Sequence, residues 1–196
     1  MIELIKLPSI PISTSTKQLI ELETERLKLR AWQESDLQPF AELNADKDVM
    51  HYFPSVLTRE QSDNLADKFQ HLILDHGWGF WAVELKATGQ FIGFTGLNTQ
   101  PEQFIFSPCV EIGWRFAQQY WHQGYATEAA QQCLAFAFEK LALEQVVSFT
   151  SVLNQASEKV MQRLGMDYVE NFMHPALDKN HALAEHVLYR IQNPKL

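Results

Sequence analysis

The positions of apolar and polar residues along the chain predict short strands that alternate with helices. In residues 110–116 every second position is apolar, from Val110 to Phe116, which is the period of two that a pleated strand imposes. Further strands are expected at residues 23–31, 80–85, 90–97 and 146–152, with a closing hairpin formed by 166–170 and 187–191.

Apolar residues spaced three and four apart predict four helices between these strands. Their expected starts are Ser35, the capping-box pair Thr58 and Gln61, Thr127 with Glu128 in its first turn, and about Ala156. Gly77 and Gly165 fit the ends of the second and fourth helices, because glycine readily adopts the left-handed conformation that closes a helix. Strands alternating with helices indicate an α/β (α+β) fold with a mixed sheet that is covered on both faces.

Composition and charge limit the possible settings and partners. The 196 residues, 46% of them hydrophobic, suit a single domain at 21–196 behind an extended arm at 1–20. A formal net charge of −8 argues against a nucleic-acid partner and is compatible with a cationic substrate such as an amine.

The two cysteines, Cys109 and Cys133, form no C-x-x-C motif, so we expect no metal site and a reduced, cytoplasmic setting. Charged residues and prolines interrupt the N-terminal apolar run, and neither a signal peptide nor a membrane span is expected.

The segment after the 110–116 strand has the character of an anion site. Small residues, Gly124 and Ala126, precede the expected helix and leave the backbone open to close approach. The first N–H groups of a helix lack internal partners and carry the positive end of its dipole, so a phosphate or pyrophosphate fits there. By itself such a loop is more often an ordinary tight connection.

Several segments, in this order along the chain, resemble one family. They are L-E-T-E-R-L-K-L-R at 22–30, F-I-G-F-T-G-L at 91–97, E-I-G-W at 111–114, Y-W-H-Q-G-Y-A-T-E-A-A at 120–130 and N-x-x-S at 154–157. Over about residues 20–191 the chain is similar to the GNAT N-acetyltransferase superfamily, and most similar to its RimJ/RimL-like branch of ribosomal-protein N-terminal acetyltransferases. The resemblance implies a three-layer fold around a mixed, mostly antiparallel sheet of six or seven strands.

The resemblance also implies where acetyl-CoA binds. Backbone groups of Trp114, Arg115 and Phe116 would contact the pantetheine and thioester, and Asn154 would hold the pantetheine through its amide. The pyrophosphate would meet backbone N–H groups of Gln123, Gly124, Tyr125, Ala126 and Thr127. Two positions depart from the commonest family pattern, because Trp121 takes the usual Arg/Gln position and Gln123 replaces a frequent basic residue.

Catalytic roles follow from the same resemblance. The tyrosine that many members use as proton donor is replaced by Met161, which leaves Ser157 as the best donor. Alternatively, Ser157 is only a helix-start hydroxyl. Glu111 is the first candidate for the base, acting directly or through water, and Glu84 is the second. The alternative for Glu111 is a structural bridge to Arg115 on the same face of the strand.

The segment between the first two helices is expected to form the acceptor side of the site. Met50, His51, Tyr52 and Phe53 are candidates there, together with Glu84. Tyr52 and Phe53 could equally be core aromatics, and a lone histidine such as His51 more often has a packing or hydrogen-bonding role than a catalytic one.

The energetics of deprotonation favour one acceptor class. A lysine-like amine costs roughly 4 to 5 kcal/mol to present neutral at pH 7, whereas a peptide α-amine costs only about 1 to 1.4. We therefore expect acetyl transfer to the α-amine of a protein or peptide N-terminus. A small amine, such as a polyamine or antibiotic, and a non-catalytic acyl-CoA-binding module are the alternatives. A monomer and a homodimer are both compatible with the sequence.

Overall fold

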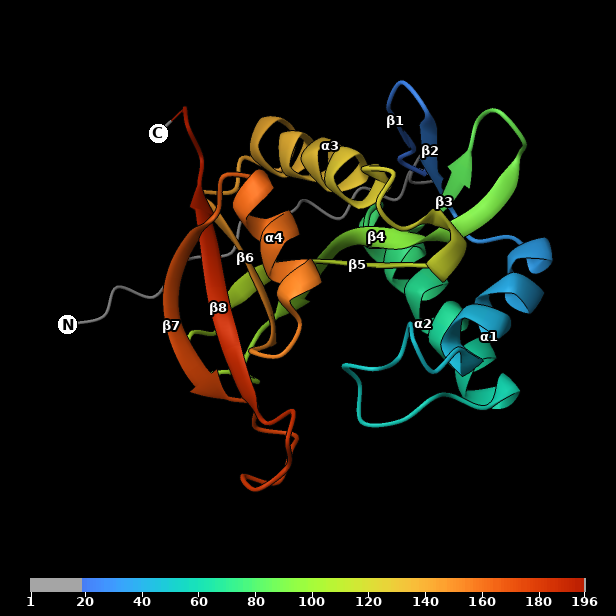
Figure 1. Cartoon of the computed structure of the whole chain (residues 1–196). Coiled ribbons are helices and arrows are strands. Elements are labelled where there is room, and N and C mark those ends of the chain that lie inside the picture. Colours follow the sequence, from blue (N-terminus) through green and yellow to red (C-terminus); the bar gives the residue numbers. More distant parts are fainter. Residues whose placement is uncertain (1–18, 196) are drawn as a thin grey trace.

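A mixed sheet of eight strands forms the centre of the computed structural model, which describes residues 19–195 (Figure 1). The strands are β1 (Leu22–Glu23), β2 (Leu27–Arg30), β3 (Phe80–Leu85), β4 (Gln90–Gln100), β5 (Cys109–Phe116), β6 (Gln145–Ser151), β7 (Asp167–Met173) and β8 (Glu185–Gln192). Their order is β1-β2-β3-β4-β5-β6-β8-β7, and every neighbouring pair is antiparallel except β5 and β6. The arm predicted at 1–20 lies almost wholly outside the described residues.

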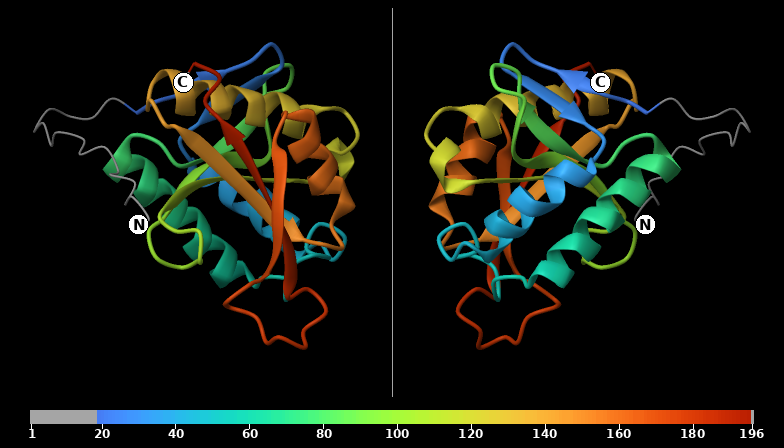
Figure 2. Two further views of the ribbon diagram at one scale, coloured as in Figure 1. Left: turned by 90° about the vertical axis from the view of Figure 1, so that its left-hand side faces the viewer. Right: turned by 90° about the vertical axis from the view of Figure 1, so that its right-hand side faces the viewer.

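Helices cover both faces of this sheet, as Figure 2 shows. They are α1 (Leu37–Ala45), α2 (Arg59–His76), α3 (Tyr125–Glu139) and α4 (Gln155–Arg163), with short 3-10 turns at Glu34–Asp36 and Gln118–Tyr120. The predicted fold class is confirmed. The sheet has more strands than the six or seven expected. One reason is that β1 is only two residues long, too short to show an alternation of apolar and polar residues.

Local capping signals placed α2 correctly and misplaced two other helix starts. Thr58 and Gln61 form the predicted capping box, and Gly77 closes the helix with φ 82°. The helix expected at Ser35 begins at Leu37 instead, because Ser35 lies inside a 3-10 turn whose Asp36 is drawn into the core by Arg30. The helix expected at Thr127 begins at Tyr125, after a glycine in the left-handed conformation.

The two central strands separate shortly after they meet. Strands β4 and β5 pair continuously from Gly93↔Phe116 to Gln100↔Cys109, whereas β5 and β6 share the single register pair Glu111↔Val147. The rest of β5, toward Phe116, therefore has an edge without a strand partner. An unpaired edge presents N–H and C=O groups that a ligand can pair with.

Candidate active site

A cavity of about 1750 Å³ opens where β5 and β6 separate. Its walls come from β5, the N-termini of α3 and α4, the segment between α1 and α2, and the segment between β7 and β8. All the cofactor residues expected from the sequence except Gln123 line it, as do the catalytic candidates Glu111 and Ser157. Residues far apart in the sequence are thus brought to one site.

The N-terminus of α3 forms one end of the cavity. Gly124 precedes the helix with φ 83°, a conformation that L side chains rarely adopt. No described side chain caps the first N–H groups of the helix, so Tyr125, Ala126 and Thr127 present theirs toward the cavity that they line. The geometry fits a phosphate or pyrophosphate.

Arg26 supplies a positive charge at the N-terminus of α3. Position 123 does not, because Gln123 replaces the basic residue that is frequent there in the family. Its guanidinium forms an ion pair of 2.6 Å with Glu128, donates to the carbonyl of Gln123 at 3.0 Å and lies 4.4 Å from the centre of the Tyr125 ring. Burial alone would raise the pKa of Glu128, but hydrogen bonds from Thr24 and Arg26 lower it, so this carboxylate stays ionised. Sequence reasoning missed Arg26, although it stands within the L-E-T-E-R-L segment.

The unpaired edge of β5 exposes alternate residues. The N–H of Ala117 donates to Ile92 of β4 at 3.0 Å, and Ser148 of β6 donates to the carbonyl of Ile112 at 3.0 Å. Because consecutive strand residues direct their backbone groups to opposite edges, Trp114 and Phe116 face the cavity side and Arg115 faces β4. This arrangement does not favour the expected contact between the backbone of Arg115 and the pantetheine. The carbonyl of Phe116 is already occupied, since it accepts from the indole N–H of Trp121 at 2.8 Å.

Two hydrogen bonds join Asn154 and Ser157 at the start of α4. The amide oxygen of Asn154 caps the helix by accepting from the Ser157 N–H at 3.2 Å, while its NH₂ donates to Thr150 at 3.0 Å and to the Ser157 hydroxyl oxygen at 3.1 Å. Both amide donors are engaged, which does not favour the expected pantetheine contact. Because the Ser157 oxygen accepts a hydrogen bond, its own O–H is left free to donate into the cavity that Ser157 lines.

Glu111 lies where β5 and β6 begin to separate. Its carboxylate accepts from the amide of Asn98 at 3.1 Å, whereas Arg115 donates to Asn44. The described residues include no ion pair between Glu111 and Arg115, so the alternative of a bridge between these two residues is wrong. Burial raises the pKa of Glu111, although hydrogen bonds from Asn98 and Gln100 and the charge of Lys68 oppose that shift. A carboxylate with a raised pKa is suited to accept a proton near neutral pH.

Phe53 lies under the guanidinium of Arg115 rather than in the core. The Arg115 side chain is 4.1 Å from the centre of that ring and 5.3 Å from that of Phe94, and it donates to the side-chain oxygen of Asn44. Phe53 is 38% exposed and lines the cavity, so the interpretation of Phe53 as a core aromatic is wrong.

The other acceptor-side candidates divide into two groups. His51 and Tyr52 line the cavity with their rings in an edge contact, 4.7 Å between centroids. Met50 is buried and does not line it. Two residues that the sequence did not indicate, His174 and His186, also line the cavity, with ring centroids 4.9 Å apart, and burial lowers the pKa of both.

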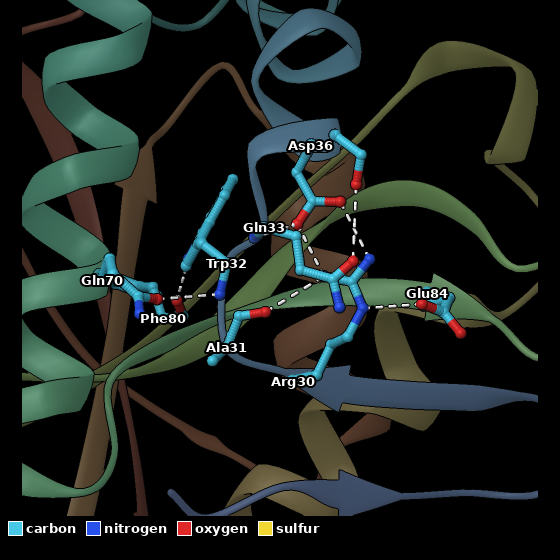
Figure 3. A network of polar contacts seen from close by, with 9 residues as sticks. Arg30, Ala31, Trp32, Gln33, Asp36, Gln70, Phe80 and Glu84 are labelled. Carbon is cyan, nitrogen blue, oxygen red and sulfur yellow. Dashed lines mark hydrogen bonds and ion pairs between the residues drawn. The ribbon is translucent and has the colours of Figure 1, made fainter.

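Glu84 lies outside the cavity, in a buried ion network (Figure 3). Its carboxylate accepts from Arg30 at 2.7 Å, and the same guanidinium donates to both oxygens of Asp36 at 2.7 and 2.9 Å. Arg30 is 4% exposed, so removing either carboxylate would leave a buried charge with too few partners. Glu84 thus anchors the start of α1, and the expectation of a base or substrate contact is wrong.

Within residues 19–195, no group of three or more His, Cys, Asp or Glu side chains is arranged to hold a metal ion. No helix in the described part of the chain is long and apolar enough to cross a membrane.

Comparison with known proteins identifies the family. The model of the acetyltransferase (GNAT) domain matches residues 26–167, so the chain belongs to the GNAT acetyltransferase family. Members of this family use acetyl-CoA, and the open helix end and strand edge described above fit that ligand.

Relatives agree with this family. The chain is similar to the protein YkkB of Bacillus subtilis (strain 168), with 32% identity over 149 residues that cover 76% of this chain and 86% of YkkB. The FsC-acetyl coenzyme A-N(2)-transacetylase of Aspergillus fumigatus is 35% identical over 100 residues, which cover 49% of this chain and only 42% of that protein. The crystal structure of a GNAT-family acetyltransferase from Bacillus anthracis has a TM-score of 0.76 at 26% identity and covers 89% of this chain and 99% of its own. The chain is an N-acetyltransferase.

Proposed function

We propose that the enzyme acetylates the α-amine of a protein or peptide N-terminus, as expected for a RimJ/RimL-like member of the family. The observation that carries the proposal is Glu111, a half-buried carboxylate with a raised pKa on the wall of a large cavity. A weak base of this kind can accept a proton from an amine whose own pKa lies only slightly above neutrality.

The geometry supports the following roles for the chain's own groups. Acetyl-CoA supplies the acetyl group as a thioester. The α3 N-terminus with Arg26 holds the phosphates, and the β5 edge at Trp114 pairs with the pantetheine arm. Glu111 takes the proton that the amine loses and returns it to water in the cavity. The free O–H of Ser157 gives a proton to the departing sulfur and recovers one from water, so that both groups end as they began. Because the Ser157 oxygen is held by Asn154, the direction of its O–H is restricted before the reaction begins.

A small amine is the second candidate acceptor. It is favoured by the Aspergillus fumigatus relative, whose name gives an N(2) position as the site of transacetylation and names no peptide.

A turnover screen separates the two candidates. Thiol release from acetyl-CoA is followed with a library of free N-terminal peptides and, in parallel, with a panel of polyamines, aminoglycosides and other small amines. Preferential turnover of peptides supports the proposal. Turnover confined to the small amines would replace it with the second candidate.

A further inference from the structure

The side chain of Arg115 has no carboxylate partner among the described residues, yet its Nε–H is fully enclosed by protein. Of its five N–H groups, the described hydrogen bonds use only the one on Nη1 that donates to Asn44. Withdrawal from water lowers the pKa of Arg115 to about 10, which still leaves the group charged at neutral pH.

Such an arrangement is unfavourable for a purely structural arginine. Arg115 is half-buried, and a cation largely withdrawn from water without a charged partner destabilises the fold. Its enclosed Nε–H lacks a hydrogen bond, although buried polar groups are nearly always hydrogen-bonded. Arg30, buried in the same protein, shows the usual solution, because it has two carboxylate partners. The rings of Phe53 and Phe94 attract the charge but accept none of its in-plane hydrogen bonds.

The surroundings hold the guanidinium in place, while hydrogen bonds among the described residues leave its Nη2 donors and the second N–H of Nη1 unused. Asn44 is fully buried and donates to the hydroxyl of Ser62 at 2.9 Å, which fixes its oxygen toward Arg115. Phe53, in the loop between α1 and α2, packs against the guanidinium. Phe53 and Arg115 both line the cavity. A guanidinium fixed in this way matches the two oxygens of a carboxylate.

We propose that Arg115 binds a carboxylate on the acceptor molecule, so that the preferred acceptor carries an acidic group near its reactive amine. This inference rests on the proposed function, in which Glu111 receives the proton of that amine. Glu111 and Arg115 lie on the same face of β5, four residues and so about 13 Å apart along the strand. The long side chains of Glu111 and Arg115 cover part of this separation, and an acidic side chain among the first three residues of a peptide acceptor covers the rest.

Matched acceptors test the proposal. The peptides carry a free amine and an amidated C-terminus, and members of each pair differ only in Asp against Asn or Glu against Gln at position 1, 2 or 3. Amino acids paired with their amides serve as small acceptors. We expect kcat/KM to favour the acidic member by about 10- to 100-fold at one position, which is the range for a hydrogen bond to a charged group.

Variants assign this preference to Arg115. Arg115→Gln should bring the acid-to-amide ratio close to one while the KM for acetyl-CoA changes less than about twofold, and Arg115→Lys should give an intermediate ratio. Asn44→Asp covers the case in which Arg115→Gln fails to fold. It places a carboxylate of the same shape beside the guanidinium, Ser62 can turn its hydroxyl to donate, and the ratio should again fall. Arg59→Gln on the outside of α2 removes an equal charge and should leave the ratio unchanged.

The remaining outcomes decide against the inference or against the proposed function. Acetylation without an acid preference, or a preference that survives both Arg115→Gln and Asn44→Asp, overturns the inference alone. A rise in acetyl-CoA KM with an unchanged ratio assigns Arg115 to the CoA phosphates and also overturns it. If no acceptor is acetylated, the proposed function fails. The carboxylate site is then tested by the thermal shift that each peptide causes in the CoA complex. Stabilisation by the acidic peptides that is lost in Arg115→Gln upholds the carboxylate site, and equal shifts in both proteins reject it.

Discussion

Arg26 and Glu128, 102 residues apart in the sequence, form an ion pair at the N-terminus of α3, where acetyl-CoA phosphates are expected. The pair keeps the first-turn carboxylate of Glu128 from repelling those phosphates. Arg26→Gln should therefore raise the KM for acetyl-CoA by about fivefold, a modest factor because the Arg26 side chain is 42% exposed and solvent screens the pair.

A double-mutant cycle provides the control for this prediction. Arg26→Gln with Glu128→Gln removes both charges and should return the KM for acetyl-CoA to within about twofold of the wild-type value. The defect of Arg26→Gln alone should also shrink as ionic strength rises. If the double variant binds acetyl-CoA worse than Arg26→Gln does, Glu128 is not the source of the repulsion.

The phosphate site depends on the backbone at Gly124. Acetyl-CoA at 100 times its Kd should stabilise the wild-type protein by about 2.7 kcal/mol, because the ligand binds only the folded state. Gly124→Val should abolish this shift, since valine is strained at φ 83° and a Cβ there would lie 3.4 Å from the Arg26 guanidinium.

Gly89→Val is a matched control for that variant. Gly89 has φ 69° in the turn between β3 and β4, and a Cβ there meets nothing within 4 Å. Both variants should unfold at a lower temperature than the wild type, but only Gly89→Val should keep the acetyl-CoA shift. A full shift in a folded Gly124→Val protein would place the phosphates elsewhere.

Elements with local signals could be predicted from the sequence, and contacts between distant segments could not. The cap and the end of α2 are encoded within a few residues of Thr58 and Gly77, and the structure confirms both. The start of α3 was misplaced because Thr127 and Glu128 resemble a cap, whereas the helix starts uncapped after a left-handed glycine.

The site shows the same division between local and distant signals. The motif residues from Gly124 to Thr127 were predicted because they follow one another in the chain. The partners of Glu84 and Arg115 were not, since Arg30 lies 54 residues from Glu84 and Asn44 lies 71 residues from Arg115. Neither contact produces a repeating pattern in the sequence. Both contacts nevertheless decide whether a charged side chain has a structural role or is free to bind a ligand.

Ser157→Ala tests the proton donor. If Ser157 protonates the departing sulfur, kcat should fall by about 10²- to 10⁴-fold while the Kd for acetyl-CoA changes little, because the contribution arises mainly in the transition state. Stability should change little, since the residue that caps α4 is Asn154.

Thr150→Val is the matched control for Ser157→Ala. Its hydroxyl also accepts from Asn154 and also lines the cavity, so this variant reports on the loss of that hydrogen bond alone. It should keep most of the wild-type kcat. A kcat for Ser157→Ala within about threefold of wild type would remove Ser157 from the chemistry and leave water as the proton source.

Glu111→Gln should show opposite effects on activity and stability. Burial raises the pKa of Glu111 above its unfolded value, so the folded state favours the protonated form. The stabilisation from this group is fully present below the unfolded pKa and is lost as the pH rises through the folded pKa. Glutamine keeps the neutral shape and can accept from Asn98, so the variant should melt at a higher temperature than the wild type at pH 7 to 8. The two melting temperatures should converge below about pH 4.

Over the same range of pH, the wild-type kcat/KM should rise with pH as Glu111 ionises, and the Glu111→Gln variant should lose activity together with that ascending limb. A variant that is more stable but keeps the full pH profile would show that the Glu111 carboxylate is not the base.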